Sequence, residues 1–333
     1  MENVKLTFVN VGYGEAMVLE CPAPERPGGV FVMVIDGGSA EAAEYADRSS
    51  GRLTLAEYLE KRALDHIDCM VATHIHEDHT CGLLPVAEKW PPKELWQTLP
   101  EDFYRTSMHL LEPEKAETAS QSKFLRALND YQALCALVEQ HGGRICRLTA
   151  GAKGTLASDV SWQVLAPMDI KAAELEACCR ELFQETEPHA FLKKLAALVG
   201  RMNNFSMSLR LECRGIRALL PGDTNCTGYA DIPTEELRAD VFKVGHHGQK
   251  DGAAPELLAA IQPKMVVCCA SSDRRYESAH PNTMAMVVEA GGKLYFSDCP
   301  QVESSIGTAA PHQALEFAVD EQGGLSARYL TTV

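Results

Sequence analysis

The sequence has no long uninterrupted hydrophobic run. A membrane-spanning helix needs about 20 consecutive apolar residues, and no window of the 333 residues approaches that length. The first residues alternate between apolar and polar side chains, which is typical of a β-strand and not of a secretory signal peptide. We therefore expect a cytoplasmic protein with no role in the membrane.

Basic residues are scarce as well. Lys and Arg together number 31 against 46 Asp and Glu, which gives a formal net charge of −15 at pH 7. Because a surface of this sign repels polyanions at long range, the composition excludes a protein that coats nucleic acid. A local metal site could still attract one phosphate group.

The sequence lacks any CxxC pair, although it contains 12 cysteines. Two adjacent pairs occur, at 178–179 and 268–269, and most of the cysteines lie among apolar residues. This distribution predicts reduced, mostly buried thiols instead of a disulfide framework. With 46% hydrophobic residues and scattered Gly and Pro, the chain is globular and is neither collagen-like nor a coiled coil.

Much of the chain consists of predicted strands, several of which end in polar clusters. We interpret the chain as one α/β domain over residues 1–333. The strand-like segments are two runs within residues 4–19, broken by Gly12-Tyr13-Gly14, and residues 30–35, 67–72, 206–213, 217–220, 241–244, 265–270, 293–296 and 314–319. Four polar clusters follow such segments. Because α/β sheets bind ligands at the carboxyl ends of their strands, these clusters are the candidate site.

Two stretches have helical periodicity instead. They lie at about residues 102–140 and 170–202, and we interpret both as helical insertions. Between them we predict a strand pair at 144–148 and 160–165, and residues 53–62 form a shorter predicted helix. The insertions are expected to cap the site and restrict the size of its substrate.

The segment His74-x-His76-x-Asp78-His79 is the most specific motif in the chain. It places three imidazoles and a carboxylate within six residues, and borderline divalent cations prefer these ligand types. Alternate residues of an extended segment point the same way, so His74 and His76 can bind one ion. After the turn, Asp78 and His79 can face a second ion.

Three further polar residues follow predicted strands. Asp223, in Pro-Gly-Asp, would bring a carboxylate to the mouth of the same sheet, where it could bridge two cations. His246 and His247 stand between glycines after residues 241–244, and we choose His246 as the ligand that completes the second metal site. Asp36 is expected to hold the ligand loop through hydrogen bonds.

These residues, in this order, resemble the metallo-β-lactamase superfamily. The resemblance implies a four-layer αββα sandwich with a dinuclear site at the edge of two sheets. The finer pattern is similar to the domain at the C-terminus of the competence protein ComEC and to its stand-alone relatives. The motifs that carry this likeness are Val9-Asn10-Val11-Gly12-Tyr13-Gly14-Glu15-Ala16, Ile35-Asp36-Gly37-Gly38, Asn203-Asn204-Phe205-Ser206, Leu219-Leu220-Pro221-Gly222-Asp223, Lys243-Val244-Gly245-His246-His247-Gly248 and Ala279-His280-Pro281.

The chain also departs from the patterns of these relatives. Asn10 and Glu15 stand where the first motif usually has aspartates. As in the ComEC-like group, no histidine occupies the third motif of true lactamases. Asn204 and Ser206 stand nearby and are candidates to support the site or touch substrate.

The resemblance implies a metal-dependent hydrolase, and we expect a phosphodiesterase. Two divalent cations, Zn²⁺ or Mn²⁺, would present a bridging hydroxide to a small phosphodiester, a nucleotide or a short nucleic acid. Asp78 would orient the hydroxide, and His247 or His280 would protonate the leaving oxygen. No organic cofactor is expected, and a homodimer is left open.

Two other functions remain open at this stage. The same hydroxide could attack a lactone, thioester or amide, although the missing third-motif histidine weighs against this. A noncatalytic, metal-stabilised module that binds a protein partner through the helical insertions is the other alternative.

Overall fold

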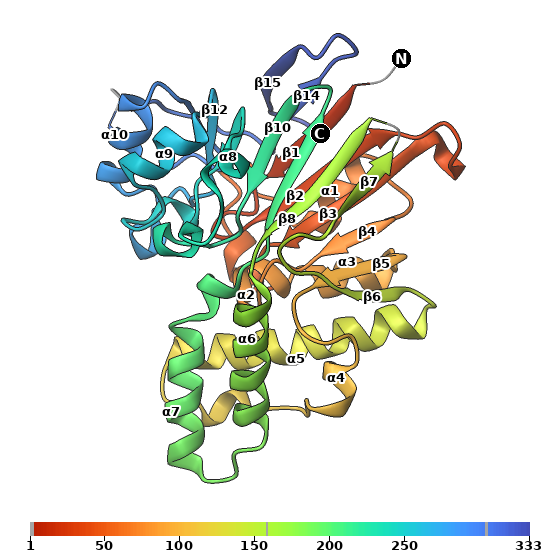
Figure 1. The fold of residues 1–333 in the computed structure, drawn as a ribbon, viewed down its shortest axis with the longest axis vertical. Helices are drawn as coiled ribbons and strands as arrows, with labels where there is room; N and C mark the ends of the chain where they lie inside the picture. The colour runs from red at the N-terminus through yellow and green to blue at the C-terminus, as the bar shows by residue number, and fades with distance from the viewer. Residues whose placement is uncertain (1–2, 158, 304–305) are drawn as a thin grey trace.

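A computed structural model of the protein describes residues 3–157, 159–303 and 306–333. Its strands form two sheets that lie face to face (Figure 1). The first sheet has the strand order β15 (Leu325–Leu330), β14 (Ala314–Val319), β1 (Val4–Val9), β2 (Ala16–Pro22), β3 (Val30–Gly37), β4 (Cys69–Val71), β5 (Glu94–Gln97), β6 (Arg144–Arg147). The second has the order β13 (Lys293–Phe296), β12 (Met265–Cys268), β11 (Val241–Lys243), β10 (Ile216–Leu220), β9 (Ser208–Cys213), β8 (Val160–Ala166), β7 (Lys153–Ala157).

Helices cover the outer face of each sheet. Those of the N-terminal half are α1 (Leu55–Lys61), α2 (Glu77–Thr80), α3 (Leu83–Lys89), α4 (Phe103–Thr106) and α5 (Ala119–Gln140). Those that follow are α6 (Asp169–Phe183), α7 (Pro188–Val199), α8 (Thr234–Leu237), α9 (Pro255–Ile261) and α10 (Pro281–Glu289). None of the helices in the described ranges is long and apolar enough to cross a membrane.

The side-chain alternation of β3 explains how the layers form. Phe31, Met33 and Ile35 join the apolar cluster between the sheets, whereas Val32 and Val34 join the cluster under the helices. Both faces of this strand are therefore buried, which is why its sequence is a continuous apolar run. A third cluster lies between the second sheet and the helices α8, α9 and α10. The predicted αββα sandwich is confirmed.

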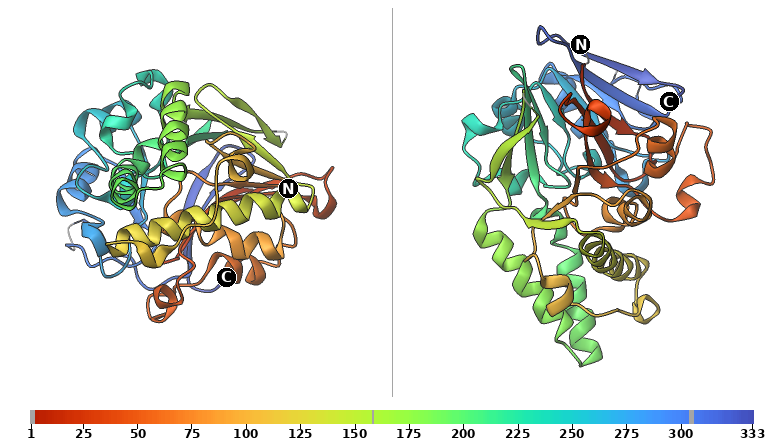
Figure 2. Two further views of the ribbon diagram at one scale, coloured as in Figure 1. Left: turned by 90° about the horizontal axis from the view of Figure 1, so that it is seen from below. Right: turned by 90° about the vertical axis from the view of Figure 1, so that its right-hand side faces the viewer.

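The two predicted helical segments contain α4 and α5, and α6 and α7, respectively. A capping box starts α5, in which the Thr118 hydroxyl accepts from the Gln121 backbone N–H and the Gln121 side chain accepts from the Thr118 N–H. Figure 2 shows α5, α6 and α7 gathered at one end of the two sheets. This is also the end at which Phe124 and Val199 line the main cavity.

The predicted strand pair at 144–148 and 160–165 is wrong. Both strands exist, but β6 pairs with β5 in the first sheet, and β8 pairs with β7 and β9 in the second. The intervening strand β7 escapes prediction because Lys153–Ala157 shows no apolar alternation. The twelve cysteines are free thiols, mostly buried, as predicted.

Candidate metal centre and cavity

The candidate site lies where four strands end. β3 and β4 run parallel in the first sheet, and β10 and β11 run parallel in the second. Asp36 lies at the end of β3 and the histidine motif follows β4, while Asp223 and His247 follow β10 and β11. The carboxyl ends of parallel strands share one edge of a sheet, and the facing of the two sheets brings both edges together.

A buried cluster of two imidazoles and two carboxylates forms at this junction. His247 Nε2 lies 3.0 Å from Asp78 Oδ2 and 3.1 Å from Asp223 Oδ2. His79 Nε2 lies 3.4 Å from the same Asp223 oxygen and 3.3 Å from His247 Nε2. These nitrogen and oxygen atoms therefore converge on one point, as the ligands of a divalent cation do.

The electrostatics of this cluster fit a cation. Burial by itself would raise the pKa of Asp78 and Asp223, but the adjacent imidazoles outweigh it and hold both carboxyls well below their usual pKa. Burial would likewise lower the pKa of His79 and His247, and the carboxylates outweigh it and raise both. The two carboxylates thus favour positive charge at this point, which a divalent metal supplies when it replaces the imidazole protons.

A second pair of imidazoles stands beside this cluster. His74 Nε2 lies 3.1 Å from His76 Nδ1. Burial, reinforced by the neighbouring imidazoles, lowers the pKa of His74 well below its usual value, and burial also lowers that of His76. Both rings are therefore neutral near pH 7, and the neutral ring is the form that binds metals. The donor types and their burial therefore fit the binding of a divalent cation, and His74 and His76 stand next to the buried group of Glu15, His79, Asp223 and His247.

Hydrogen bonds hold the candidate ligands in place. Asp36 accepts from the backbone N–H of Thr73 at 2.9 Å, from its hydroxyl at 2.6 Å, and from His79 Nδ1 at 2.8 Å. The Ser206 hydroxyl accepts from the backbone N–H of Asp223 at 3.2 Å. Asp36 and Ser206 therefore lie directly behind the ligands, and such partners fix the orientation of a metal-binding imidazole or carboxylate.

A buried lysine joins the same centre, and the sequence analysis missed it. Lys243 is fully buried, and its ammonium forms an ion pair with the buried carboxylate of Glu15. It also donates to the Gly222 carbonyl at 2.7 Å and lies 3.4 Å from Asp223 Oδ1. Burial lowers the pKa of Lys243 to about 8, so most of it keeps its charge at pH 7. The signal that could have found it is a lysine at the end of a strand whose other residues are apolar.

The geometry at the two adjacent histidines differs from the expectation that His246 is the metal ligand and His247 the proton donor, because His247 and not His246 lies in the cluster. His246 lies at the wall of the cavity, and its Nδ1 lies 2.9 Å from Asp251 Oδ1. His247 is the residue that reaches Asp78 and Asp223, while its Nδ1 donates to the Cys269 carbonyl at 2.9 Å. Both histidines have left-handed φ angles of about 50°, and this tight turn, which a strand pattern does not show, decides which ring faces inward.

Two other candidates also lie elsewhere. His280 caps the N-terminus of α10, where its Nδ1 accepts from the Asn282 N–H, and it lines a separate surface hollow beside Pro281. Asn204 lines a small pocket on the far side of its 3₁₀ turn, and its neighbour Asn203 lines the main cavity instead. A one-residue shift within a tight turn reverses the direction of a side chain, so the motif alone could not separate the two asparagines.

The cluster opens into a cavity of about 270 Å³. The helical insertions supply part of its wall: α5 contributes Ser120, Lys123 and Phe124, and Phe124 packs against His76 with ring centroids 5.6 Å apart. The remaining lining residues are Tyr13, Ser39, Glu44, Glu77, Asp78, Val199, Asn203, Asp223, His246, Gln249, Arg275 and Tyr276. Both insertions therefore border the cavity, and the expectation that they restrict the size of the substrate stays a prediction.

Comparison with known proteins matches this architecture. Residues 25–144, which include the histidine motif, match the family model of the metallo-beta-lactamase superfamily. ComE operon protein 3 of Bacillus subtilis (strain 168) is 22% identical over 289 residues, which is 85% of this chain. The chain spans 30% of the length of that relative.

Solved structures with a similar fold include two from bacteria. The metallo-beta-lactamase fold protein YhfI from Bacillus subtilis has 10% identity and a TM-score of 0.46, with 90% of this chain and 97% of that chain covered. Zn²⁺-bound PqqB from Methylobacterium extorquens has 10% identity and a TM-score of 0.44, with 88% and 97% covered. This chain is therefore similar to the metallo-beta-lactamase superfamily over residues 25–144, which contain the histidine motif, and to ComE operon protein 3 over most of its length.

Proposed function

We propose that this protein is a metal-dependent hydrolase that acts on a small phosphodiester. The observation that carries the proposal is the charge of the cavity beside the ligand cluster. The cavity is lined by four carboxylates and by only two cationic side chains among the described residues. The carboxylates are those of Glu44, Glu77, Asp78 and Asp223, and the cations are Lys123 and Arg275. Two bound divalent cations would reverse the sign of this formal charge, so the loaded cavity attracts an anion.

The same observation favours a phosphodiester over a neutral lactone, thioester or amide. A diester carries a single negative charge at its reacting centre, and a cavity of about 270 Å³ admits a small diester but not a duplex. The acidic surface of the chain, with its net charge of −15, also disfavours long nucleic acids.

Each candidate ligand has a place in this proposal. His74 and His76 would hold one cation, and Asp78, His79 and His247 the other, with Asp223 beside both sets. When bound, such cations polarise phosphoryl oxygens and make water acidic enough to attack at neutral pH. Zn²⁺ and Mn²⁺ both suit imidazole and carboxylate ligands.

The other residues of the chain position these groups. Asp36 keeps the Nδ1 proton on His79, which leaves its Nε2 free to bind a cation. Lys243 restrains the second oxygen of Asp223. His246 is the imidazole that remains at the cavity wall outside the ligand cluster, and we assign it, in place of His280, a hydrogen bond to the substrate.

The test is hydrolysis of bis(p-nitrophenyl) phosphate by the purified protein with added Zn²⁺ or Mn²⁺. Asp223→Asn removes one ligand charge, and Asp65→Asn is the matched control because Asp65 is 87% exposed in its side chain. We expect metal-dependent turnover that falls at least about 100-fold in Asp223→Asn and is unchanged in Asp65→Asn. Metal content measured on the same samples shows whether Asp223→Asn acts through lost metal.

Two outcomes would contradict the proposal. Hydrolysis of p-nitrophenyl acetate or a thioester without hydrolysis of the diester would assign the centre to carbonyl substrates. Stoichiometric metal binding with no turnover of either class would favour a noncatalytic binding module.

A further inference from the structure

An exposed tyrosine stands at the mouth of the cavity. Tyr276 is 59% exposed and lines the same cavity as His76, Asp78 and Asp223. Its ring centroid lies 5.1 Å from that of Tyr13, edge to face, and the Tyr13 ring lies 4.6 Å from the His247 ring. An aromatic surface therefore leads from solvent to the ligand cluster.

The backbone that presents Tyr276 is held in an unfavourable conformation. Arg274, Tyr276, Glu277 and Ala279 all have φ between 47° and 59°, a region that L side chains rarely adopt. The loop is tied to the turn after β11, because Ala279 N–H donates to the His247 carbonyl at 3.0 Å. Backbone strain of this kind concentrates at binding and catalytic sites, where the surrounding structure maintains it.

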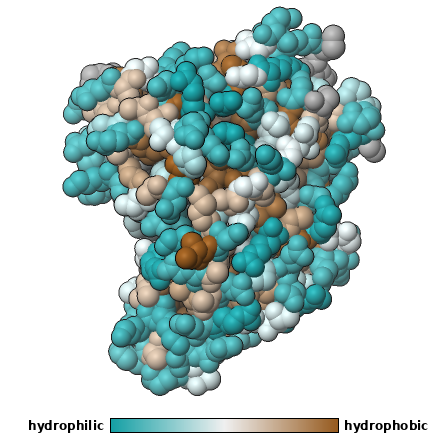
Figure 3. Space-filling model, viewed as in Figure 1, coloured by the Kyte–Doolittle hydropathy of each residue, from teal (hydrophilic) through white to brown (hydrophobic). Residues whose placement is uncertain are grey.

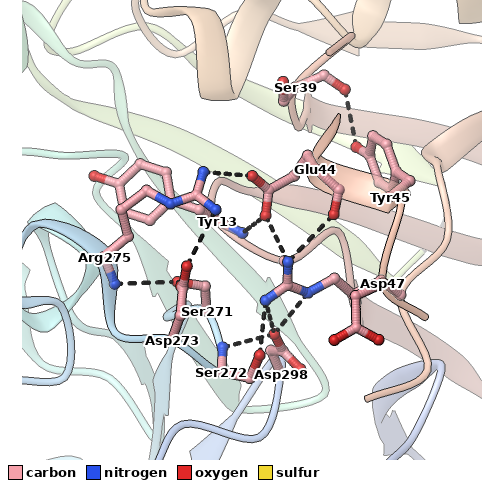
Figure 4. A network of polar contacts seen from close by, with 12 residues as sticks. Tyr13, Ser39, Glu44, Tyr45, Asp47, Ser271, Ser272, Asp273, Arg275 and Asp298 are labelled. Carbon is pink, nitrogen blue, oxygen red and sulfur yellow. Dashed lines mark hydrogen bonds and ion pairs between the residues drawn. The ribbon is translucent and has the colours of Figure 1, made fainter. Parts of the chain in front are cut away.

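A buried ionic network fixes the neighbours of Tyr276 (Figure 4). Arg275 forms an ion pair with Glu44 at 2.6 Å, and the other Glu44 oxygen accepts from the Tyr13 backbone N–H at 2.9 Å. Arg52 bridges Glu44 at 2.9 Å and Asp298 at 3.0 Å. Glu44, Arg52 and Asp298 are each at most 8% exposed. The two tyrosines are therefore positioned by long-range contacts and not by their own loop alone.

The cations at the cavity mouth are already paired. Arg275 also contacts Asp273 at 3.2 Å, and Lys123 lies 3.2 Å from Glu41 and 3.7 Å from Glu77. Each of the two cationic side chains that line the cavity in the described residues thus has two carboxylate partners. A second phosphate on a ligand would have to displace one of these partners, whereas an uncharged flat ring would not.

We infer that Tyr276, backed by Tyr13, is an aromatic platform that binds a flat ring carried by the substrate. The inference rests on the proposed function and narrows its substrate class to a monoanionic phosphodiester with an aryl group or a nucleobase. Aromatic side chains bind such rings by stacking, which tolerates different ring types.

The experiment measures equilibrium binding to the metal-loaded protein by calorimetry, with three phosphodiesters whose integrity after each titration is checked by chromatography, because the proposed activity could cleave them. Adenosine 5′-methyl phosphate and methyl phenyl phosphate carry a ring, and dimethyl phosphate does not. We expect both ring ligands to bind more tightly than dimethyl phosphate. In Tyr276→Ala their Kd should rise roughly 5- to 150-fold, which is the usual contribution of one stacked ring, while that of dimethyl phosphate stays unchanged.

Two variants serve as controls. Tyr276→Phe keeps the ring and should retain the affinity of the parent protein. Leu110→Ala removes another exposed apolar side chain, 77% exposed and absent from the cavity lining, and should change nothing. Equal affinity of Tyr276→Ala and the parent protein for the ring ligands would overturn the platform, as would failure of the parent protein to prefer a ring.

These outcomes are separate from those of the proposed function. If bis(p-nitrophenyl) phosphate is hydrolysed but the ring ligands show no dependence on Tyr276, the platform fails and the phosphodiesterase stands. If ring ligands depend on Tyr276 but no diester is turned over, the platform stands and the phosphodiesterase fails. A preference for the adenosine ligand over the phenyl ligand would select the nucleobase as the natural ring.

Discussion

Replacing Lys243 by methionine is expected to destabilise the protein strongly. The substitution keeps the length and apolar stem of the side chain but removes the ammonium that faces two buried carboxylates. Glu15, whose side chain is 0% exposed, would keep only imidazoles as cationic neighbours among the described residues, namely His247 Nδ1, 3.7 Å away, and a His79 ring nitrogen within 4.8 Å. Asp223 would lose a cation 3.4 Å from its Oδ1.

The magnitude follows from the cost of an unpaired buried charge. Removing one partner of a buried ion pair typically costs about 3–5 kcal/mol, because the remaining charge stays desolvated. Neutralising Glu15 as well, in Lys243→Met/Glu15→Gln, removes that charge and leaves an amide short of hydrogen bonds, which costs about 1–3 kcal/mol. The double variant should therefore be more stable than Lys243→Met alone.

The assay is urea unfolding of the metal-free proteins, followed by tryptophan fluorescence and circular dichroism. Metal is removed because a bound divalent cation would offset part of the excess negative charge. Lys264→Met is the matched control: Lys264 pairs with Asp240 at 2.8 Å, but its side chain is 70% exposed. Exposed pairs contribute about 0–1 kcal/mol, so this variant should unfold near the parent midpoint.

The reasoning is refuted if Lys243→Met unfolds at the same urea concentration as Lys264→Met. It is also refuted if Glu15→Gln fails to recover stability in the Lys243→Met background. If Lys243→Met does not accumulate in folded form, a folded Lys243→Met/Glu15→Gln double variant would likewise show that the unpaired Glu15 charge causes the instability.

Three more outcomes are expected. Chelation of divalent cations should lower the Tm of the protein, and added Zn²⁺ or Mn²⁺ should restore it, because the ligand cluster exists only in the folded chain. An unchanged Tm in scanning fluorimetry would argue against a metal centre. Burial alone would raise the pKa of Asp68. The hydrogen bond from Lys93 at 2.7 Å and the other partners of the Asp68 carboxylate outweigh burial and lower this pKa. The stabilising contribution of the Asp68 carboxylate is therefore present above about pH 4, the unfolded pKa, and is lost as pH falls through the lower folded value. Asp68→Asn should thus cost about 1–3 kcal/mol at pH 7 and less at pH 2, as measured by urea titrations. Gly82→Ala should cost about 1–3 kcal/mol or more, because a Cβ would collide with the Gly37 carbonyl oxygen. Gly200→Ala should be tolerated, because a Cβ there would meet only ordinary contacts, the nearest being the Ala196 carbonyl oxygen at 3.6 Å. Equal unfolding midpoints for the two variants would contradict the close approach at Gly82.

Local patterns explain what was predictable about the metal centre. His74 and His76 are two residues apart on an extended segment, so their approach follows from backbone geometry alone. The strands that lead to Asp36 and Asp223 are apolar runs that end at a turn, and their position at a sheet edge follows from that pattern. Sequence reasoning therefore brought these side chains to the sheet edge where the structure has them, and their role as metal ligands stays a prediction.

Long-range packing decided the details. His246 and His247 are neighbours with the same chemistry, and only the left-handed turn that carries them determines which ring is buried. The pairing of Lys243 with Glu15 joins different sheets, so no local pattern reveals it. The partners of β6 and β8 are set by the order of strands in each sheet, which short segments do not specify.

The sequence by itself determined the α/β class, the histidine motif and the acidic character of the chain, because alternation, residue spacing and net charge are properties of neighbouring residues and composition. The four-layer αββα arrangement was implied by the family resemblance of the motifs and not by these patterns. Only the tertiary structure decided that His247 lies inside and His246 at the cavity wall, that Lys243 balances Glu15, and that Tyr276 stands over the cavity. These features depend on contacts between segments far apart in the chain, whose geometry is fixed only when the two sheets pack against each other.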